Sequence, residues 1–160
     1  MNSQKAIITP VTQELDQKHI PYRVFQHPGQ VHSLEQAARE RGQRPEQVIR
    51  SLLFRLPGDE FIMVLVAGPA QLSWAKLREF LSTNRMTMAT PEEVDRLTGY
   101  PTGAVSPFGL PRPLRILMDQ GALLEDEISI GSGIRNTTII LSKMDLLQAL
   151  PGVEIGNFIE

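Results

Sequence analysis

The sequence has no cysteine among its 160 residues and only three histidines. The missing cysteine excludes a disulfide scaffold, a thiol nucleophile and every metal or iron–sulfur site that needs thiolate ligands. The histidines, His19, His27 and His32, form no HxH, HExxH or HxxxH pair. We therefore expect no histidine-rich metal site and no cofactor.

Motifs for nucleotide-driven or triad chemistry are also missing. The sequence contains no GxSxG elbow, no GxxxxGK[ST] phosphate loop and no GxGxxG fingerprint, and Gly131-Ser132-Gly133 is an isolated GxG. Ser106, within VSPFG, does not match a nucleophile elbow. Hydrolysis by a triad, by a metal or by nucleotide turnover therefore has no support in the sequence.

Long apolar stretches are absent as well. The longest, Phe61–Ala67, is far shorter than the about 20 residues that a membrane-spanning helix needs. Charged and amide residues interrupt residues 1–19, so we expect no signal peptide and a cytoplasmic protein without a membrane partner. The net charge of -2 argues against a general nucleic-acid coat, and we expect no DNA partner.

The charge is nevertheless uneven along the chain. Residues 39–55 hold five arginines and two glutamates, which gives this segment a net charge of +3. Such a segment either steers a phosphate backbone locally or is a solvated helix face, and the sequence leaves both interpretations open.

Helix caps and chain breakers divide the sequence into short elements. Helices are predicted to begin at Thr9-Pro10, Ser33, Ser73, Thr90 and Ser142, with a helical turn at Pro45. Strands are predicted at Tyr22–Phe25, Ser51–Leu56, Phe61–Ala67, Leu114–Met118, Glu127–Ile130 and Thr137–Leu141.

This order of elements, with a tight hairpin at Pro57-Gly58-Asp59, predicts an α+β (mixed α/β) fold with helices around a mixed sheet. Phe61–Ala67 is apolar throughout, so we expect it at the centre of that sheet with both faces buried. The length fits a single domain over residues 1–160. The last ten residues are expected to be peripheral.

The most informative segment is Thr98–Leu110, TGYPTGAVSPFGL, which combines three glycines, two prolines and a serine with apolar residues. It is too apolar for a linker and too rich in breakers for a regular element. We expect a rigid loop that turns backbone N–H groups toward a cavity, where they can hold a carbonyl oxygen or an oxyanion. A tight, well-packed turn without catalytic function is the alternative.

From about Pro21 to Leu150 the chain resembles the YbaK-type editing domain that is associated with prolyl-tRNA synthetases. The resemblance rests on four segments in this order: His27-Pro28, Val48–Phe54, the loop Gly99–Gly109 with its GxxxP pattern from Gly103 to Pro107, and Gly131–Arg135. It implies a single editing domain with a core at about 21–150 and a mixed sheet that curls toward a barrel, with a cleft on one side.

The resemblance also implies an activity and its partners. Proteins of this family hydrolyse the ester that joins a wrong amino acid to the 3′ end of a tRNA, most often tRNA for proline, without a metal. Backbone donors of the glycine–proline loop hold the scissile carbonyl, and the terminal ribose hydroxyl of the tRNA helps to activate water. An aminoacylated tRNA, in trans, is the expected partner, with an aminoacyl-tRNA synthetase as a second one.

The site residues that the resemblance implies fall into two groups. The catalytic group is Arg50, Gly103, Ser106 and Pro107, and the substrate-binding group is His27, Val105, Phe108, Gly131, Ser132, Gly133 and Arg135. Ser106 is expected to donate a hydrogen bond rather than to act as a nucleophile, because no base is identifiable near it. The small-residue loop suggests a small aminoacyl group such as Cys or Ala.

Arg50 stands where the family usually has lysine. Arginine keeps the charge and can bind a phosphate through two parallel hydrogen bonds, but it is longer and planar and does not lose its proton. Arg50 is therefore expected to anchor the 3′-terminal phosphate or ribose, or else to be a strand-edge arginine paired with a carboxylate.

Two rival functions remain open at this level. A non-catalytic binding module would recognise a tRNA 3′ end or an amino-acid-like ligand and release it unchanged, and the departure at Arg50 favours it. A structural or dimerisation domain with a vestigial cleft would use the apolar strand Phe61–Ala67 and bind no ligand.

Overall fold

The computed structural model describes residues 7–160, so the first six residues of the segment examined for a signal peptide lie outside it. The described chain forms five α-helices: α1 (Pro10–Gln17), α2 (Leu34–Glu40), α3 (Trp74–Leu81), α4 (Pro91–Thr98) and α5 (Lys143–Ala149). Eight strands accompany them: β1 (Arg23–Gln26), β2 (Ile49–Leu56), β3 (Glu60–Ala67), β4 (Thr87–Met88), β5 (Arg115–Asp119), β6 (Glu127–Gly131), β7 (Thr137–Ser142) and β8 (Glu154–Gly156). Two short 3-10 helices, Pro45–Gln47 and Gln120–Leu123, complete the order.

The five predicted helix starts are confirmed by the hydrogen bonds of their caps. The side chains of Thr9, Ser33, Ser73, Thr90 and Ser142 each accept a hydrogen bond from the backbone N–H three residues further on. Such a bond satisfies one of the N–H groups that the first turn of a helix leaves without a partner. The local signals in the sequence are therefore sufficient to place these helices.

The strands form two sheets rather than one curled sheet. β1, β7 and β6 make an antiparallel sheet, and the second sheet has the order β4-β2-β3-β5-β8. In the second sheet β2 and β3 form the predicted hairpin, whereas β5 pairs in parallel with β3 and with β8. A single bridge between Val48 and Ser129 joins the two sheets. The mixed α+β class is confirmed, but the expected closure toward a barrel is not.

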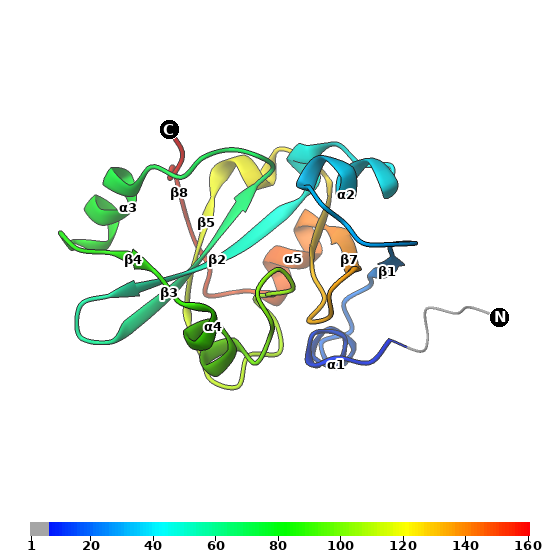
Figure 1. The fold of residues 1–160 in the computed structure, drawn as a ribbon, viewed down its shortest axis with the longest axis horizontal. Coiled ribbons are helices and arrows are strands. Elements are labelled where there is room, and N and C mark those ends of the chain that lie inside the picture. The colour runs from blue at the N-terminus through cyan, green and yellow to red at the C-terminus, as the bar shows by residue number, and fades with distance from the viewer. Residues whose placement is uncertain (1–6) are drawn as a thin grey trace.

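The central position of β3 is confirmed and explains its unbroken apolar sequence. Met63 and Leu65 face the larger core cluster, which also holds Leu15 and Phe108, while Ile62 and Val64 face the smaller one. Both faces of β3 are thus covered, so no position on it needs a polar side chain. Figure 1 shows the arrangement, with α3 beside β8 at one end and α1, α2 and the β1–β7 pair at the other.

The prediction that the last ten residues are peripheral is wrong. β8 pairs with β5, and the Phe158 side chain is only 1% exposed within the smaller core cluster. The buried Asp119 carboxylate fixes this segment, because its Oδ1 accepts from the N–H of Phe158 at 2.8 Å and its Oδ2 from the N–H of Gly121 at 2.8 Å. These contacts are tertiary, so the local sequence of residues 151–160 does not predict them.

We predict that Asp119→Ala lowers the free energy of unfolding by about 2–4 kcal/mol, because it removes two hydrogen bonds to a charged acceptor and leaves two N–H groups without a partner. Urea denaturation monitored by circular dichroism measures the change. Asp95→Ala, an exposed position on α4, is the matched control, and we expect it to change stability by less than about 0.5 kcal/mol. Equal stability of Asp119→Ala and the wild type would contradict the role assigned to this carboxylate.

Candidate functional site

A cavity of about 640 Å³ opens where the two sheets meet. Its walls come from the first half of β2, the end of β6 and the start of β7, the loop that follows α4, and residues of α2 and its C-terminal cap. Segments far apart in the sequence therefore share one hollow, which is the usual setting of a small-molecule site.

One wall of the cavity is an open strand edge. The N–H of Gly68 donates to the carbonyl of Val48, and the N–H of Ala89 donates to the carbonyl of Leu53 on the other side of β2. Backbone groups alternate sides along a strand, so the even-numbered residues of β2 bond β3 and the odd-numbered ones point outward. β4 pairs only with Phe54 and Arg55. The backbone N–H and carbonyl of Ser51 are consequently left on the edge that lines the cavity.

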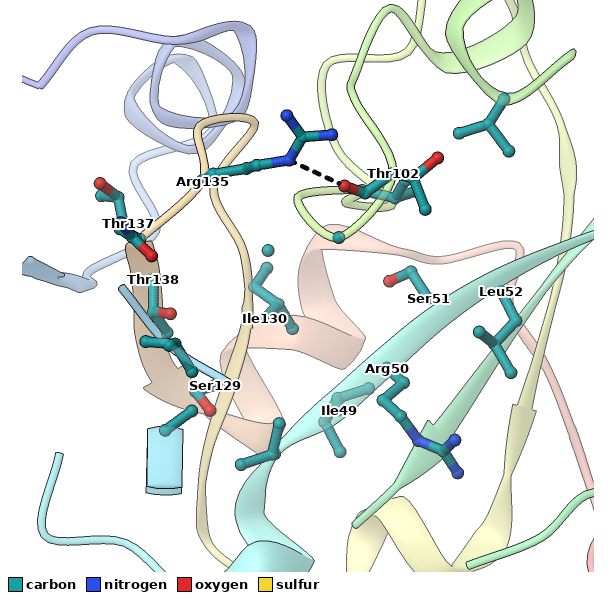
Figure 2. Close-up of a pocket in the computed structure, with 18 of the residues that line it drawn as sticks. Ile49, Arg50, Ser51, Leu52, Thr102, Ser129, Ile130, Arg135, Thr137 and Thr138 are labelled. Atoms are coloured by element: carbon teal, nitrogen blue, oxygen red, sulfur yellow. Dashed lines mark hydrogen bonds between the residues drawn. The ribbon is translucent and has the colours of Figure 1, made fainter. Parts of the chain in front are cut away.

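The side chain of Ser51 adds a second free group at the same place. Its hydroxyl oxygen is buried and has no hydrogen-bond partner, and Figure 2 shows it directed into the cavity. A buried polar atom without a partner costs free energy unless a ligand or water satisfies it. Sequence reasoning missed Ser51, although it immediately follows Arg50 in a strand with alternating faces.

The opposite wall is the loop after α4, and several contacts make it rigid. Gly99 ends α4 at φ 77° and Gly103 has φ 92°, conformations that favour glycine. The hydroxyl of buried Tyr100 donates to the carbonyl of Phe108 at 2.6 Å, and burial raises the pKa of this phenol. Within residues 7–160 the N–H groups of Gly103 and Val105 meet no acceptor, and both residues line the cavity.

Gly131 at the end of β6 lies directly against this loop. A Cβ atom placed there would overlap the carbonyl oxygen of Val105 and come within 2.9 Å of that of Ala104. The N–H of Gly133 donates to the carbonyl of Ala104 at 2.9 Å and holds the two segments together. Glycine at 131 is therefore required by close approach of backbone to backbone rather than by its φ angle.

The residues that the resemblance implies divide into two groups in space. His27, Arg50, Gly103, Val105, Gly131 and Arg135 line the cavity. The other five do not line it: Ser106, Pro107 and Phe108 are buried within the loop, and Ser132 and Gly133 lie in the turn between β6 and β7. The Ser106 hydroxyl accepts from the N–H of Phe108 at 3.2 Å, and the Ser132 hydroxyl donates to the carbonyl of Thr137 at 2.9 Å.

The structure does not bring the guanidinium of Arg50 to the Gly103 loop. Arg50 and Ser51 are neighbours on a strand, so their side chains point to opposite faces, and Figure 2 shows Arg50 directed away from Thr102. One Nη atom of Arg50 donates to the carbonyl of Ala70, and its Nε is buried without a partner. Burial lowers the pKa of this guanidinium.

Arg135 lies on the same side of the cavity as the loop. Its Nε donates to the carbonyl of Thr102 at 3.2 Å, as Figure 2 shows, and its side chain is exposed. This bond ties the turn between β6 and β7 to the loop after α4.

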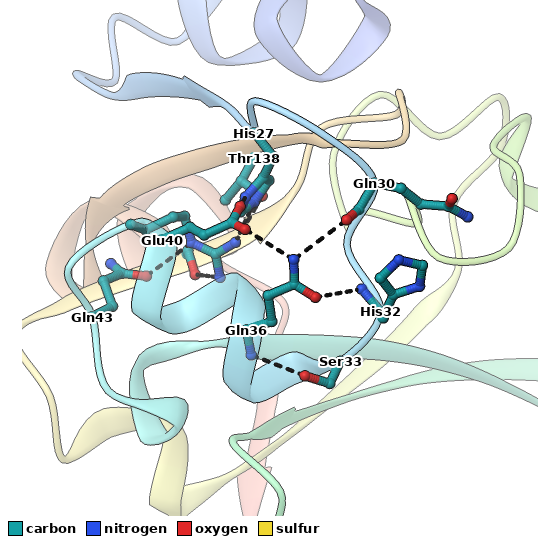
Figure 3. A network of polar contacts seen from close by, with 10 residues as sticks. His27, Gln30, His32, Ser33, Gln36, Glu40, Gln43 and Thr138 are labelled. Carbon is teal, nitrogen blue, oxygen red and sulfur yellow. Dashed lines mark hydrogen bonds and ion pairs between the residues drawn. The ribbon is translucent and has the colours of Figure 1, made fainter.

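A partly buried polar network around His27 and Arg41, which both line the cavity, stands at the far wall (Figure 3), and sequence reasoning named only His27 from it. The Nδ1 of His27 lies 2.6 Å from a carboxylate oxygen of Glu40, and its Nε2 lies 3.0 Å from an Nη of Arg41. A guanidinium only donates, so Nε2 is the acceptor and Nδ1 carries the proton. Both ring nitrogens of His27 are thus engaged within the network.

The charged members of this network have shifted pKa values. Burial lowers the pKa of Arg41 to about 10, and the nearby Glu40 carboxylate partly opposes this. Hydrogen bonds from Gln36 and then from His27 lower the pKa of Glu40. The network therefore places the imidazole of His27 between the Glu40 carboxylate and the Arg41 guanidinium.

The arginine-rich segment 39–55 does not form a continuous cationic face. Arg41 is engaged in the network, Arg44 pairs with Glu125, and Arg55 pairs with Asp59 at 2.7 Å. In residues 7–160 no cluster of histidine, aspartate and glutamate is suited to hold a metal ion. The same part of the chain contains no helix long and apolar enough to cross a membrane.

Comparison with known proteins identifies the family. Residues 28–149 match the family model described as the aminoacyl-tRNA editing domain. The chain is 29% identical over 149 residues to the multifunctional Ser/Thr-tRNA deacylase ProXp-y of Escherichia coli, which covers 90% of this chain and 87% of that protein.

Two further similarities extend the comparison. The chain is 25% identical over 138 residues to a proline–tRNA ligase of Aquifex aeolicus, which covers 84% of this chain and 23% of the ligase, so the chain spans less than a quarter of that protein. A crystal structure described as a candidate trans-editing enzyme for prolyl tRNA synthetase superposes with a TM-score of 0.85 at 26% identity, over 100% of this chain and 99% of that one. The chain belongs to the aminoacyl-tRNA editing domain family.

Proposed function

We propose that this protein is a trans-editing deacylase that hydrolyses the ester between a mischarged amino acid and the 3′ end of its tRNA. The observation that carries the proposal is the pairing of two sets of free backbone groups across one cavity. Gly103 and Val105, whose N–H groups meet no acceptor within residues 7–160, line one wall, and the edge of β2 at Ser51 lines the other.

The proposed hydrolysis requires few catalytic side chains. An aminoacyl ester is already activated relative to an amide, so a positioned carbonyl and a positioned water supply much of the required rate. A well-placed N–H donor to the developing oxyanion contributes about 2.7–4 kcal/mol. In this mechanism the loop N–H groups hold the carbonyl oxygen, and the ribose hydroxyl of the tRNA orients the water without a metal. Ser106 and Pro107 stabilise the conformation of the loop without lining the cavity.

The residues at the cavity edge are assigned to the tRNA end. Arg50 anchors the 3′-terminal phosphate, which requires its guanidinium to leave the carbonyl of Ala70. Arg135 and Gly131 shape the pocket for the amino acid next to Val105, and the loop behind them depends on Phe108, Ser132 and Gly133.

The substrate we propose is a tRNA for proline that carries a small amino acid. We propose Cys and Ala as the attached amino acids because the loop is built of small residues. The similarity to proline–tRNA ligases supports tRNA for proline as the carrier. Ser and Thr follow from the similarity to the Escherichia coli deacylase, which is named for those two amino acids. All four side chains are small enough to share one pocket.

A non-catalytic binding module is the second candidate, and one observation favours it. The guanidinium of Arg50 is bonded to Ala70 rather than placed in the cavity. In a binding module the cavity would hold the aminoacylated tRNA end, or an amino-acid-like ligand, without positioning a water against the ester.

A deacylation time course separates the two. We predict that the purified protein accelerates loss of the ester from tRNA for proline charged with at least one of Cys, Ala, Ser and Thr, relative to buffer. The measurement follows the labelled amino acid that remains attached to the tRNA. Flat time courses for the whole panel, together with retained binding of the charged tRNAs, would support the binding module instead.

We predict that Gly131→Ala lowers kcat/KM by about 100-fold or more, because the new methyl displaces the loop that carries the oxyanion donors. Gly152→Ala is the matched control, since a Cβ there meets no atom within 4 Å. Circular dichroism and the melting temperature establish that both variants are folded. Full activity in folded Gly131→Ala would contradict the proposal that the loop N–H groups hold the carbonyl oxygen.

We predict that Arg50→Met raises KM for charged tRNA with little change in kcat, because a lost phosphate contact weakens binding uniformly. The slope of log kcat/KM against log salt should become shallower by about 0.7–1, the effect of one phosphate contact. Arg112→Met, an exposed arginine, serves as the control. An unchanged salt slope would show that Arg50 does not contact the phosphate.

A further inference from the structure

The partly buried guanidinium of Arg41 has no part in the mechanism proposed above, although Arg41 lines the cavity. Its side chain runs from the end of α2 to the central strand β7 and the edge strand β6 of the first sheet. Its Nε donates to Gln43 Oε1 at 3.2 Å, one Nη donates to Thr138 Oγ1 at 3.2 Å, and the other Nη donates to Ser129 Oγ at 3.0 Å. The contact with His27 Nε2 completes the set.

These contacts decide which way the wall hydroxyls point. A guanidinium carries N–H donors and no acceptor, so Thr138 and Ser129 must accept from it with their oxygen atoms. Their own hydrogens then have to be directed away from Arg41. The Ser129 hydroxyl reaches the carbonyl of Gln47 at 3.5 Å, whereas the Thr138 hydroxyl meets no acceptor within residues 7–160.

Thr138 lines the cavity and is labelled in Figure 2. Its free O–H is therefore available to a group bound in the cavity. Ser51 contributes the other unpartnered hydroxyl from the wall of β2. Among the described residues no carboxylate contacts Arg41 directly, and His27 lies between Arg41 and Glu40.

Such a wall discriminates between small side chains by their acceptor strength. A hydroxyl oxygen can accept from the Thr138 O–H, whereas a methyl group offers nothing and a thiol is only a weak acceptor. An apolar group in this position leaves the donor without a partner, and an unmade buried hydrogen bond costs more than a made one contributes.

We propose that Arg41 is a specificity-determining positioning residue that orients Thr138 as a hydrogen-bond donor and so makes the cavity select hydroxyl-bearing aminoacyl groups over Ala and Cys. The inference rests on the proposed function only in that the cavity must hold the aminoacyl group. It narrows the four candidate substrates to Ser and Thr from the contacts of this chain alone.

Binding of stable analogues tests the selection apart from hydrolysis. The probes are adenosines that carry seryl, alanyl or cysteinyl through a 3′-amide in place of the ester, and calorimetry with the full chain measures their Kd. We expect the seryl analogue to bind about 3- to 10-fold more tightly than the alanyl and cysteinyl ones. Equal affinity for the seryl and alanyl analogues, or no binding of any analogue, would overturn the inference.

Variants then assign the selection to Arg41 and Thr138. Thr138→Val keeps the shape and strand preference of the residue but removes the hydroxyl, so the preference for the seryl analogue should vanish, and Thr138→Ser should retain it. Arg41→Met should also abolish the preference for the seryl analogue. Arg39 is an exposed arginine in the last turn of α2, and Arg39→Met should leave that preference intact. An undiminished preference in Thr138→Val overturns the inference even if Arg41→Met does not fold.

The two proposals fail in different ways. Analogue binding with the seryl preference but without ester hydrolysis would refute the deacylase and support the selection by Arg41. Rapid hydrolysis of alanyl-tRNA and seryl-tRNA at equal kcat/KM would support the deacylase and refute the selection.

Discussion

The site depends on the direct contact between the backbone of Gly131 and the carbonyls of Ala104 and Val105. This contact joins the end of the three-stranded sheet to the loop after α4, and no side chain fits between them. The loop is fixed from its other side by Tyr100, whose hydroxyl bonds the carbonyl of Phe108. Together these contacts set the distance across the cavity from the loop N–H groups to the edge of β2, and therefore decide what the cavity can hold.

The cavity is lined by polar groups that have no hydrogen-bond partner within the fold. The N–H groups of Gly103 and Val105 and the hydroxyl of Ser51 have no partner within the described chain. A fold tolerates such groups where a ligand or water completes them. The partly buried Arg41 is different, because its hydrogen bonds to Gln43, Thr138, Ser129 and His27 satisfy most of its donors and hold the far wall in one arrangement. One wall is thus open to a ligand, and the other is fixed in advance.

The sequence predicts those features that are encoded locally. Ser and Thr caps place the helices, and the unbroken apolar run of β3 places it at the centre of its sheet. Strands β4 and β8 were missed because they are only 2 and 3 residues long and exist through pairing with distant strands. The division into two sheets likewise depends on tertiary pairing, which composition does not reveal.

The site was predictable in part for the same reason. Motif resemblance found the loop and Gly131, because a close backbone approach requires glycine in the sequence. It did not separate residues that line the cavity, such as Gly103, from residues that support it, such as Phe108, since burial depends on the whole fold. Alternation along β2 puts Arg50 and Ser51 on opposite faces, but only the packing of the second sheet decides which face meets the cavity. Arg41 was missed because a buried arginine looks in sequence like any other member of a basic segment.

A crystal structure of the protein with a 3′-amide analogue of an aminoacylated adenosine tests the central claim most directly. The account predicts that the acyl carbonyl oxygen lies about 2.7–3.1 Å from N–H groups of the loop that contains Gly103 and Val105. An analogue bound with its carbonyl turned away from that loop, or bound outside the cavity, would contradict it.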